Sequence, residues 1–274
     1  MPIKSILTVT GTEQGDDDLL QVAALCDSAG LHLSVLVVQL AAPPPIGEFA
    51  AVVSEAWLAE RRDDERYLEE RRSAVNALLA GRGADIRSVY VEMVDADNEI
   101  GRQARYADLV IAGPQMLQDH LLRNKLVEGV LFGSGRPLLL MPYSSPLSLA
   151  PRRVVIGWDG GLEAARAVRE SLEILAAAGE VSIALVDPSA GEEGQLLGTD
   201  LASYLARHGC RASIERLESS GRSVHQTLCD HAAAVEADLM VLGAYGHSRL
   251  RERIFGGVTR SFLENVPLPV LMAR

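Results

Sequence analysis

The chain has 274 residues, of which 48% are hydrophobic and 23% charged, and its formal net charge is -11. These proportions are typical of a soluble globular protein, and the length allows roughly two domains of ordinary size. The negative charge argues against nucleic-acid binding and binding to anionic membranes, since both need an extended basic face. No apolar run reaches the roughly 18 residues of a membrane-spanning helix. The N-terminus has no signal-peptide pattern, so we expect a cytoplasmic protein.

The first half alternates apolar runs with segments of helical periodicity. A helix is predicted after the first run, because Asp16, Asp17 and Asp18 would occupy its first turn and Gly30 would cap its C-terminus. The run 31–40 is apolar almost throughout, which is typical of a strand buried on both faces of a parallel sheet. The pattern predicts strands at 6–10, 31–40, 85–93, 109–112 and 137–141, and helices at 16–29, 49–80, 99–106 and before the last strand.

The second half repeats this plan. Alternation of strands with helices indicates an α/β fold with a parallel sheet and right-handed crossovers. Its predicted strands are 154–158, 181–186, 211–217, 239–242 and 270–272, and its predicted helices are 162–178, 195–208, 224–235 and a segment that opens at Gly256 and Gly257.

Direct comparison of the halves indicates a duplication. ADLVIAGPQ, which begins at Ala107, matches ADLMVLGAY, which begins at Ala237. RPLLLMP at Arg136 corresponds to LPVLMAR at Leu268 in the same way. A segment of linker composition, 143–151, lies between the halves. We therefore predict two tandem domains of one fold, with boundaries at 1–146 and 147–274.

The stretch 237–274 has the pattern of an anion-binding loop. Gly243 ends an apolar run, Gly246 follows within the loop, and Gly256 and Gly257 open a helical segment. Glycines allow backbone amides to approach a ligand closely, and a helix start offers unpaired amides. The alternative is a solvated, arginine-rich turn. The basic residues concerned are Arg249, Arg251, Arg253 and Arg260.

The spacing of these glycines resembles the nucleotide-binding signature of the universal stress proteins. In that signature, G-x-x-G is followed after nine residues by a further G and a small residue. The resemblance implies a tandem protein with two flavodoxin/Rossmann-like domains, each a five-stranded parallel sheet of order 3-2-1-4-5. It also implies ATP or a related adenine nucleotide as ligand, with Mg²⁺ as a candidate companion ion. In ATP-binding members a Ser or Thr follows the third glycine. Here Gly257 stands in that place, and Thr259 is the candidate substitute donor.

The resemblance places the ligand between the first and fourth strands of the second half. It assigns Gly157, Trp158 and Asp159 to the adenine or ribose side and Val186 to the base. Asp159 can equally serve as a turn or N-cap residue, and Trp158 would either stack on a base or block the pocket. The candidate binding residues are Gly157, Trp158, Asp159, Val186, Leu242, Gly243, Gly246, Gly256, Gly257, Val258 and Thr259.

The first half lacks several of these features. Pro114 follows Gly113, the second motif glycine is missing, and the first strand ends Val9–Thr10–Gly11–Thr12 without the aspartate that the second half carries at Asp159. We expect this half to have lost nucleotide binding and to serve as a structural partner for the second half; the alternative is that it holds a different ligand.

No catalytic motif is present, neither G-x-S-x-G nor GxxxxGK[ST] nor G-x-G-x-x-G. His225 and Cys229 would share a helix face and His231 would point elsewhere, which does not favour a zinc site. A lone His247 is more typical of a solvated loop than of a catalytic group.

Three functional classes remain open. They are a nucleotide-binding stress-response module, a slow ATPase, and a nucleotide-free scaffold that acts through protein contacts. Protein partners cannot be named from the sequence. Tandem fusion predicts an intramolecular pseudo-dimer, and a further homodimer stays open.

Overall fold

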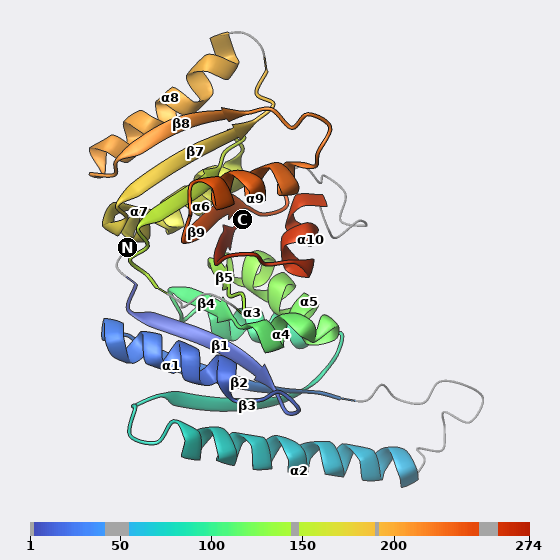
Figure 1. The fold of residues 1–274 in the computed structure, drawn as a ribbon. Coiled ribbons are helices and arrows are strands. Elements are labelled where there is room, and N and C mark those ends of the chain that lie inside the picture. Colours follow the sequence, from blue (N-terminus) through green and yellow to red (C-terminus); the bar gives the residue numbers. More distant parts are fainter. Residues whose placement is uncertain (1–2, 42–54, 144–147, 190–191, 247–256) are drawn as a thin grey trace, which may run out of the picture. The chain divides into compact units, whose positions relative to one another are not determined.

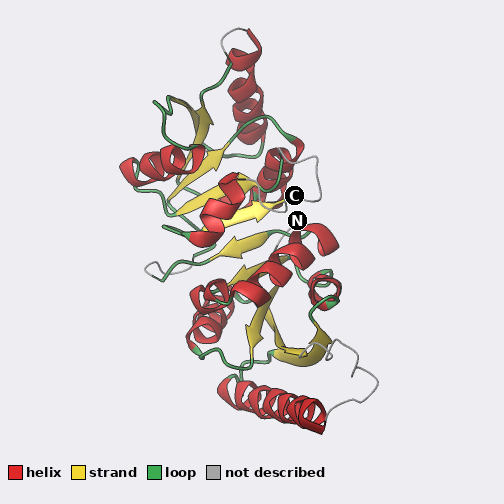
Figure 2. Ribbon diagram, turned by 90° about the vertical axis from the view of Figure 1, so that its right-hand side faces the viewer, coloured by secondary structure: helices red, strands yellow, loops and turns green. Residues whose placement is uncertain are grey.

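The computed structural model describes residues 3–41, 55–143, 148–189, 192–246 and 257–274. The chain forms two compact units, Ile3–Arg136 and Pro137–Arg274. In each unit, helices cover both faces of a mostly parallel sheet (Figures 1 and 2). The predicted α/β class is therefore confirmed. Among the described residues, no helix has the length and apolar character needed to span a membrane.

The first unit is built on four parallel strands in the order β3-β2-β1-β4. Ile6 of β1 lies in register with Leu33 of β2 on one side and with Leu109 of β4 on the other. All three are buried, because helices cover both faces of the central parallel strands. The elements are β1 (Ser5–Gly11), α1 (Asp17–Ala29), β2 (His32–Ala41), α2 (Glu55–Leu78), β3 (Asp85–Glu92), α3 (Ala96–Ala104), β4 (Leu109–Ala112), α4 (Pro114–Gln118), α5 (His120–Glu128) and the π-helical turn η1 (Gly129–Ser134).

The predicted elements of this half are found with small shifts at their ends. Gly30 caps α1 in the left-handed conformation, φ 65°, and its N–H donates to Cys26 O. The one helical segment expected before 137–141 is divided into α4, α5 and η1. The first division falls at Asp119, whose extended backbone ends α4 and whose side chain accepts from Leu122 N at the start of α5. Residues 49–54 of the predicted helix 49–80 lie outside the described residues.

A carboxylate from α1 caps the first turn of α4. Asp18 Oδ2 accepts hydrogen bonds from Gln115 N at 3.0 Å and from Met116 N at 3.1 Å, and the residue is 7% exposed. A Cβ atom on Gly113 would lie 2.6 Å from Asp18 Cβ, so the close approach requires glycine at that position. Amides at the start of a helix attract an anion, and here the chain itself supplies one.

Asp18 gives the first unit a pH-dependent contribution to stability. Burial raises the pKa of the Asp18 carboxyl above its ordinary value of 3.8, against the opposing effect of the two backbone hydrogen bonds. Since a raised pKa stabilises the protonated state, this contribution is complete below pH 3.8 and is lost as the pH rises through the folded-state pKa. We expect Asp18→Asn, which keeps an acceptor for both amides, to raise the melting temperature at pH 7. The gain should disappear below pH 3.8.

The matched control is Asp17→Asn, an exposed residue in the same turn, which should shift the melting temperature less at pH 7. A lower melting temperature of Asp18→Asn than of wild type at pH 7 would mean that the charged form of Asp18 is stabilising, and would contradict the prediction.

The described residues of the second unit form six strands in the order β5-β10-β9-β6-β7-β8. All neighbouring pairs are parallel except β5 and β10, which are antiparallel. The elements are β5 (Leu138–Leu140), β6 (Arg153–Gly157), α6 (Leu162–Glu170), α7 (Leu172–Ala177), β7 (Glu180–Val186), α8 (Glu192–Arg207), β8 (Ala212–Leu217), α9 (Val224–Ala234), β9 (Leu239–Gly243), α10 (Gly257–Glu264) and β10 (Val270–Ala273).

The predicted strand order is found in this unit, where β8-β7-β6-β9-β10 corresponds to 3-2-1-4-5. The strand expected at 137–141 is β5, and it pairs with β10, so the last strands of the two sequence halves lie side by side. The units divide between residues 136 and 137, whereas the domain boundary at 146/147 stays a prediction. The single helix expected at 162–178 is interrupted at Ser171, whose hydroxyl donates to Ala167 O at 2.7 Å.

Candidate functional site

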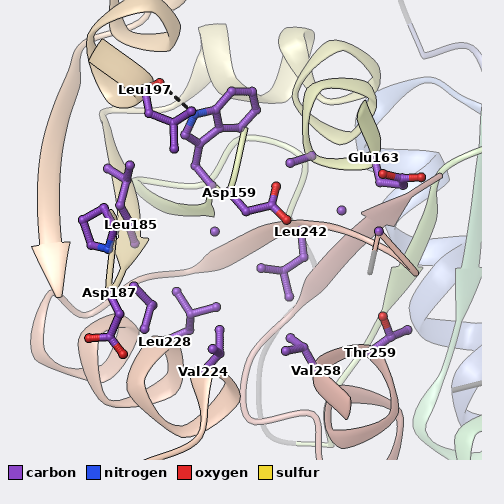
Figure 3. Close-up of a pocket in the computed structure, with 18 of the residues that line it drawn as sticks. Asp159, Glu163, Leu185, Asp187, Leu197, Val224, Leu228, Leu242, Val258 and Thr259 are labelled. Carbon is purple, nitrogen blue, oxygen red and sulfur yellow. Dashed lines mark hydrogen bonds between the residues drawn. The ribbon is translucent and has the colours of Figure 1, made fainter. Parts of the chain in front are cut away.

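A cavity of about 410 Å³ opens at the carboxyl ends of β6, β7 and β9 (Figure 3). The final residues of these strands, Gly157, Val186 and Gly243, all line it. Its volume lies in the range of small-molecule pockets. Ligands of open α/β sheets bind outside the carboxyl ends of the strands, so the cavity occupies the position that this fold favours for a ligand.

Ten of the eleven candidate residues chosen from the sequence line this one cavity. They come from the ends of three strands, the loops that follow β6 and β9, and the first turn of α10. Gly256 lies outside the described residues. The ten are Gly157, Trp158, Asp159, Val186, Leu242, Gly243, Gly246, Gly257, Val258 and Thr259.

Aliphatic side chains form one side of the cavity. Figure 3 shows them opposite Glu163 and Thr259, and they are Leu185, Leu197, Val224 and Leu228. Such a surface suits the flat, weakly polar faces of an aromatic ring. None of these four residues was among the sequence candidates, because periodicity alone marks them only as ordinary core positions on β7, α8 and α9.

Trp158 lines the cavity without filling it. Its indole Nε1 donates to Leu197 O at 2.9 Å, and its backbone N donates to Ala184 O at 2.9 Å. The first hydrogen bond holds the half-buried side chain against the first part of α8, and the second fixes the backbone of Trp158 beside β7. The ring therefore forms a fixed part of the wall.

One of the candidate glycines, Gly243, is required by packing. A Cβ atom on Gly243 would lie 2.7 Å from Glu163 C and 2.9 Å from Ala164 Cα, in the first turn of α6. Contacts this short with backbone atoms force the chain to move. Gly243 thus permits the end of β9 to approach the start of α6 closely beside the cavity. At Gly157 a Cβ atom would lie 2.5 Å from Leu242 Cδ2, the end of a side chain that has room to rotate away.

We expect Gly243→Ala to lower the free energy of unfolding of the second unit by about 1–3 kcal/mol, the usual cost of overpacking a rigid contact. Gly257→Ala is the matched control, because no atom of the described residues lies within 4 Å of the added methyl group. In the first turn of a helix the control should leave stability unchanged or raise it slightly. Urea unfolding of both variants measures their free energies of unfolding. An equal loss of stability in the two variants would contradict the packing role of Gly243.

Polar groups gather at the side of the cavity where β9 ends. Gly246 lies there, and a Cβ atom on it would be 3.2 Å from Glu163 Oε2 and 3.9 Å from Asp159 Oδ2. Asp159 Oδ1 accepts from Gly161 N at 2.8 Å, which matches the turn role weighed for it, and the residue also lines the cavity. Glu163 was missed by sequence reasoning, since an acidic residue in a first helical turn is common.

The loop after β9 is tied to α10 by a hydrogen bond. Tyr245 adopts a left-handed backbone conformation, φ 65°, and its N donates to Thr259 Oγ1 at 3.3 Å. Thr259 is 4% exposed. The Thr259 hydroxyl, considered above as a phosphate donor, therefore also serves to hold the loop in place.

These residues lie in the part of the chain that a family model identifies. The universal stress protein family model matches residues 151–274. The second half of the chain is a universal stress protein domain.

Solved structures extend the same fold over both halves. A universal stress protein from Archaeoglobus fulgidus DSM 4304 is 16% identical, with a TM-score of 0.64, and the match covers 98% of this chain and 96% of that one. A candidate universal stress protein from Pseudomonas aeruginosa UCBPP-PA14 is 17% identical, with a TM-score of 0.55, and the match covers 98% of this chain and 92% of that one. At such identities the similarity shows the fold alone.

A universal stress protein solved in complex with cAMP is 24% identical over 46% of this chain and 98% of that one, with a TM-score of 0.38. This similarity is too low to bear on the ligand of the present chain. A comparison with curated proteins found no match.

The basic residues expected near the glycine motif are only partly described. Arg260 of the universal stress protein domain donates from Nε to Glu264 Oε1 at 2.8 Å, along the exposed surface of α10. The other three, Arg249, Arg251 and Arg253, lie outside the described residues, as does His247.

The His and Cys residues of α9 are arranged as their spacing suggested. Cys229 Sγ lies 3.7 Å from His225 Nε2, whereas His231 Nε2 is 2.9 Å from Ser182 Oγ on β7. Burial lowers the pKa of His231, which favours its neutral form in this contact. The described residues of the universal stress protein domain contain no group of three or more potential metal ligands.

Proposed function

We propose that the universal stress protein domain binds ATP or a related adenine nucleotide and acts as a sensory or regulatory module in a stress response. The observation that supports binding is the convergence of ten candidate residues on one cavity at the carboxyl ends of the strands. Family membership supports the stress-response role.

In the proposed mode of binding, the base lies against the aliphatic side of the cavity and the phosphates extend toward Gly246 and the start of α10. Leu185 and Leu228 offer apolar contact to the base. Gly257 begins α10, and amides at a helix start are suited to phosphate oxygens. Mg²⁺ usually accompanies nucleotide phosphates and takes carboxylate ligands, which Asp159 and Glu163 could supply at this side.

We further propose that the first half binds no nucleotide and serves as a structural partner. Asp18 supports this role, because its carboxylate already accepts from Gln115 N and Met116 N at the start of α4. A phosphate would have to displace a buried carboxylate that carries like charge. The antiparallel pairing of β5 with β10 also supports the predicted pseudo-dimer within one chain.

Filling the aliphatic side of the cavity tests where the base binds. Val224 is 42% exposed at the rim, so Val224→Trp should be tolerated while its indole competes with the base. We expect ATP affinity, measured by calorimetry, to fall by about tenfold or more. Leu196→Trp is the matched control, because Leu196 is 57% exposed and does not line the cavity.

Two results would count against the proposal. An equal effect of the two tryptophan substitutions would place the base elsewhere. No heat and no thermal shift of wild type with millimolar ATP would reject nucleotide binding.

Restoring the hydroxyl that the family pattern expects tests where the phosphates bind. No atom in the described part of the chain lies within 4 Å of a Cβ on Gly257, so Gly257→Ser adds a donor without a steric conflict with the described residues. A hydrogen bond to a charged group is worth about 1.5–3 kcal/mol, and we expect ATP to bind about tenfold more tightly. Adenosine, which has no phosphate, should bind unchanged. The Gly257→Ala variant adds a carbon atom without the hydroxyl and serves as the control. An equal gain in ATP affinity in that variant would contradict the predicted hydrogen bond.

A further inference from the structure

Two carboxylates border the point where the phosphates of a bound nucleotide would lie. Glu163, in the first turn of α6, places Oε2 3.2 Å from the position of a Cβ on Gly246. Asp159 Oδ2 lies 3.9 Å from the same position. Both residues line the cavity, and Figure 3 shows both carboxylates beside it.

Two described basic groups of the neighbouring elements are engaged elsewhere, whereas Arg249, Arg251 and Arg253 lie outside the described residues. Arg166, also on α6, donates from a guanidinium N–H to Arg274 O at 2.9 Å. Arg260 of α10 pairs with Glu264. Within the described part of the chain, Glu163 itself has no hydrogen bond or ion pair, so its charge is not neutralised by a described partner.

We propose that Glu163 makes the pocket select its adenine ligand by charge. Without a divalent cation, an uncharged adenine ligand such as adenosine is favoured over ATP, because the carboxylate lies beside the path of the phosphates and repels them. The repulsion between like charges a few ångströms apart is strong in a partly enclosed site and weak in open water. This inference rests on the proposed adenine site and names the class of ligand that the site prefers.

The substitution Glu163→Gln isolates the charge, because it keeps the shape of the side chain and removes its negative charge. Glu170→Gln is the matched control: it lies on the same helix, is exposed and does not line the cavity. Seven residues separate the two positions, about 10 Å along the helix axis, where an exposed charge is largely screened at about 0.1 M salt.

The experiment measures the dissociation constants of adenosine, AMP and ATP by calorimetry in EDTA, for wild type and both variants. Glu163→Gln should increase the affinity for ATP by about tenfold, the affinity for AMP by less, and the affinity for adenosine by less than about twofold. Glu170→Gln should change all three by less than about twofold. Adding Mg²⁺ should reduce the difference between the affinities of wild type for ATP and for adenosine, because the cation offsets the negative charge of the phosphates.

The outcomes separate this inference from the function on which it rests. If adenosine binds but Glu163→Gln leaves the ratio of ATP to adenosine affinity unchanged, charge selection by Glu163 is wrong and the adenine site stands. Equal tightening of adenosine and ATP would likewise overturn it, since that pattern means a change in pocket shape. If none of the three ligands binds any of the proteins, the adenine site itself is wrong.

Discussion

The site depends on the close contact between the end of β9 and the first turn of α6. Gly243 allows this contact, since a side chain there would meet the backbone of Glu163 and Ala164. The approach brings Glu163 to the cavity and lets the chain turn through the left-handed Tyr245 to Gly246. One glycine therefore fixes the position of both the acidic group and the loop. Because Gly243 has no side chain, it permits the close packing of β9 against α6 and also the approach of a ligand.

In both halves a glycine at the end of the fourth strand lies against the start of the helix that follows the first strand, but its neighbours differ: backbone atoms of Glu163 and Ala164 at Gly243, and the side chain of Asp18 at Gly113. Gly113 directly after β4 corresponds to Gly243 at the end of β9. In each half, an acidic residue also lies in the first turn of the helix that follows the first strand. In the first half that residue, Asp18, accepts from the amides at the start of α4. In the second half Glu163 lines an open cavity instead. In the first half a side chain of the chain itself thus occupies the amides that a ligand anion would otherwise contact.

Sequence patterns located most strands and the glycine loop, because burial periodicity and glycine spacing are local signals. The interruption of the helix at Ser171 was missed, since a serine is compatible with a helix until its hydroxyl bonds to the preceding turn. Glu163 and Asp18 were missed as site residues for another reason. Their roles depend on which amides or glycines of a distant segment they meet, and only the folded chain brings those segments together.

Gly257 and Trp158 act in the same direction on the interactions that the cavity offers to a nucleotide. Gly257 removes one candidate phosphate donor, and the Glu163 carboxylate adds repulsion at the same side. Trp158, fixed by its hydrogen bond to Leu197 O, adds an aromatic surface at the other side. Apolar contact contributes roughly 25 cal/mol per Å² of buried surface, and it is unaffected by ligand charge. In the proposed binding mode, the described walls of this cavity therefore favour the base over the phosphates.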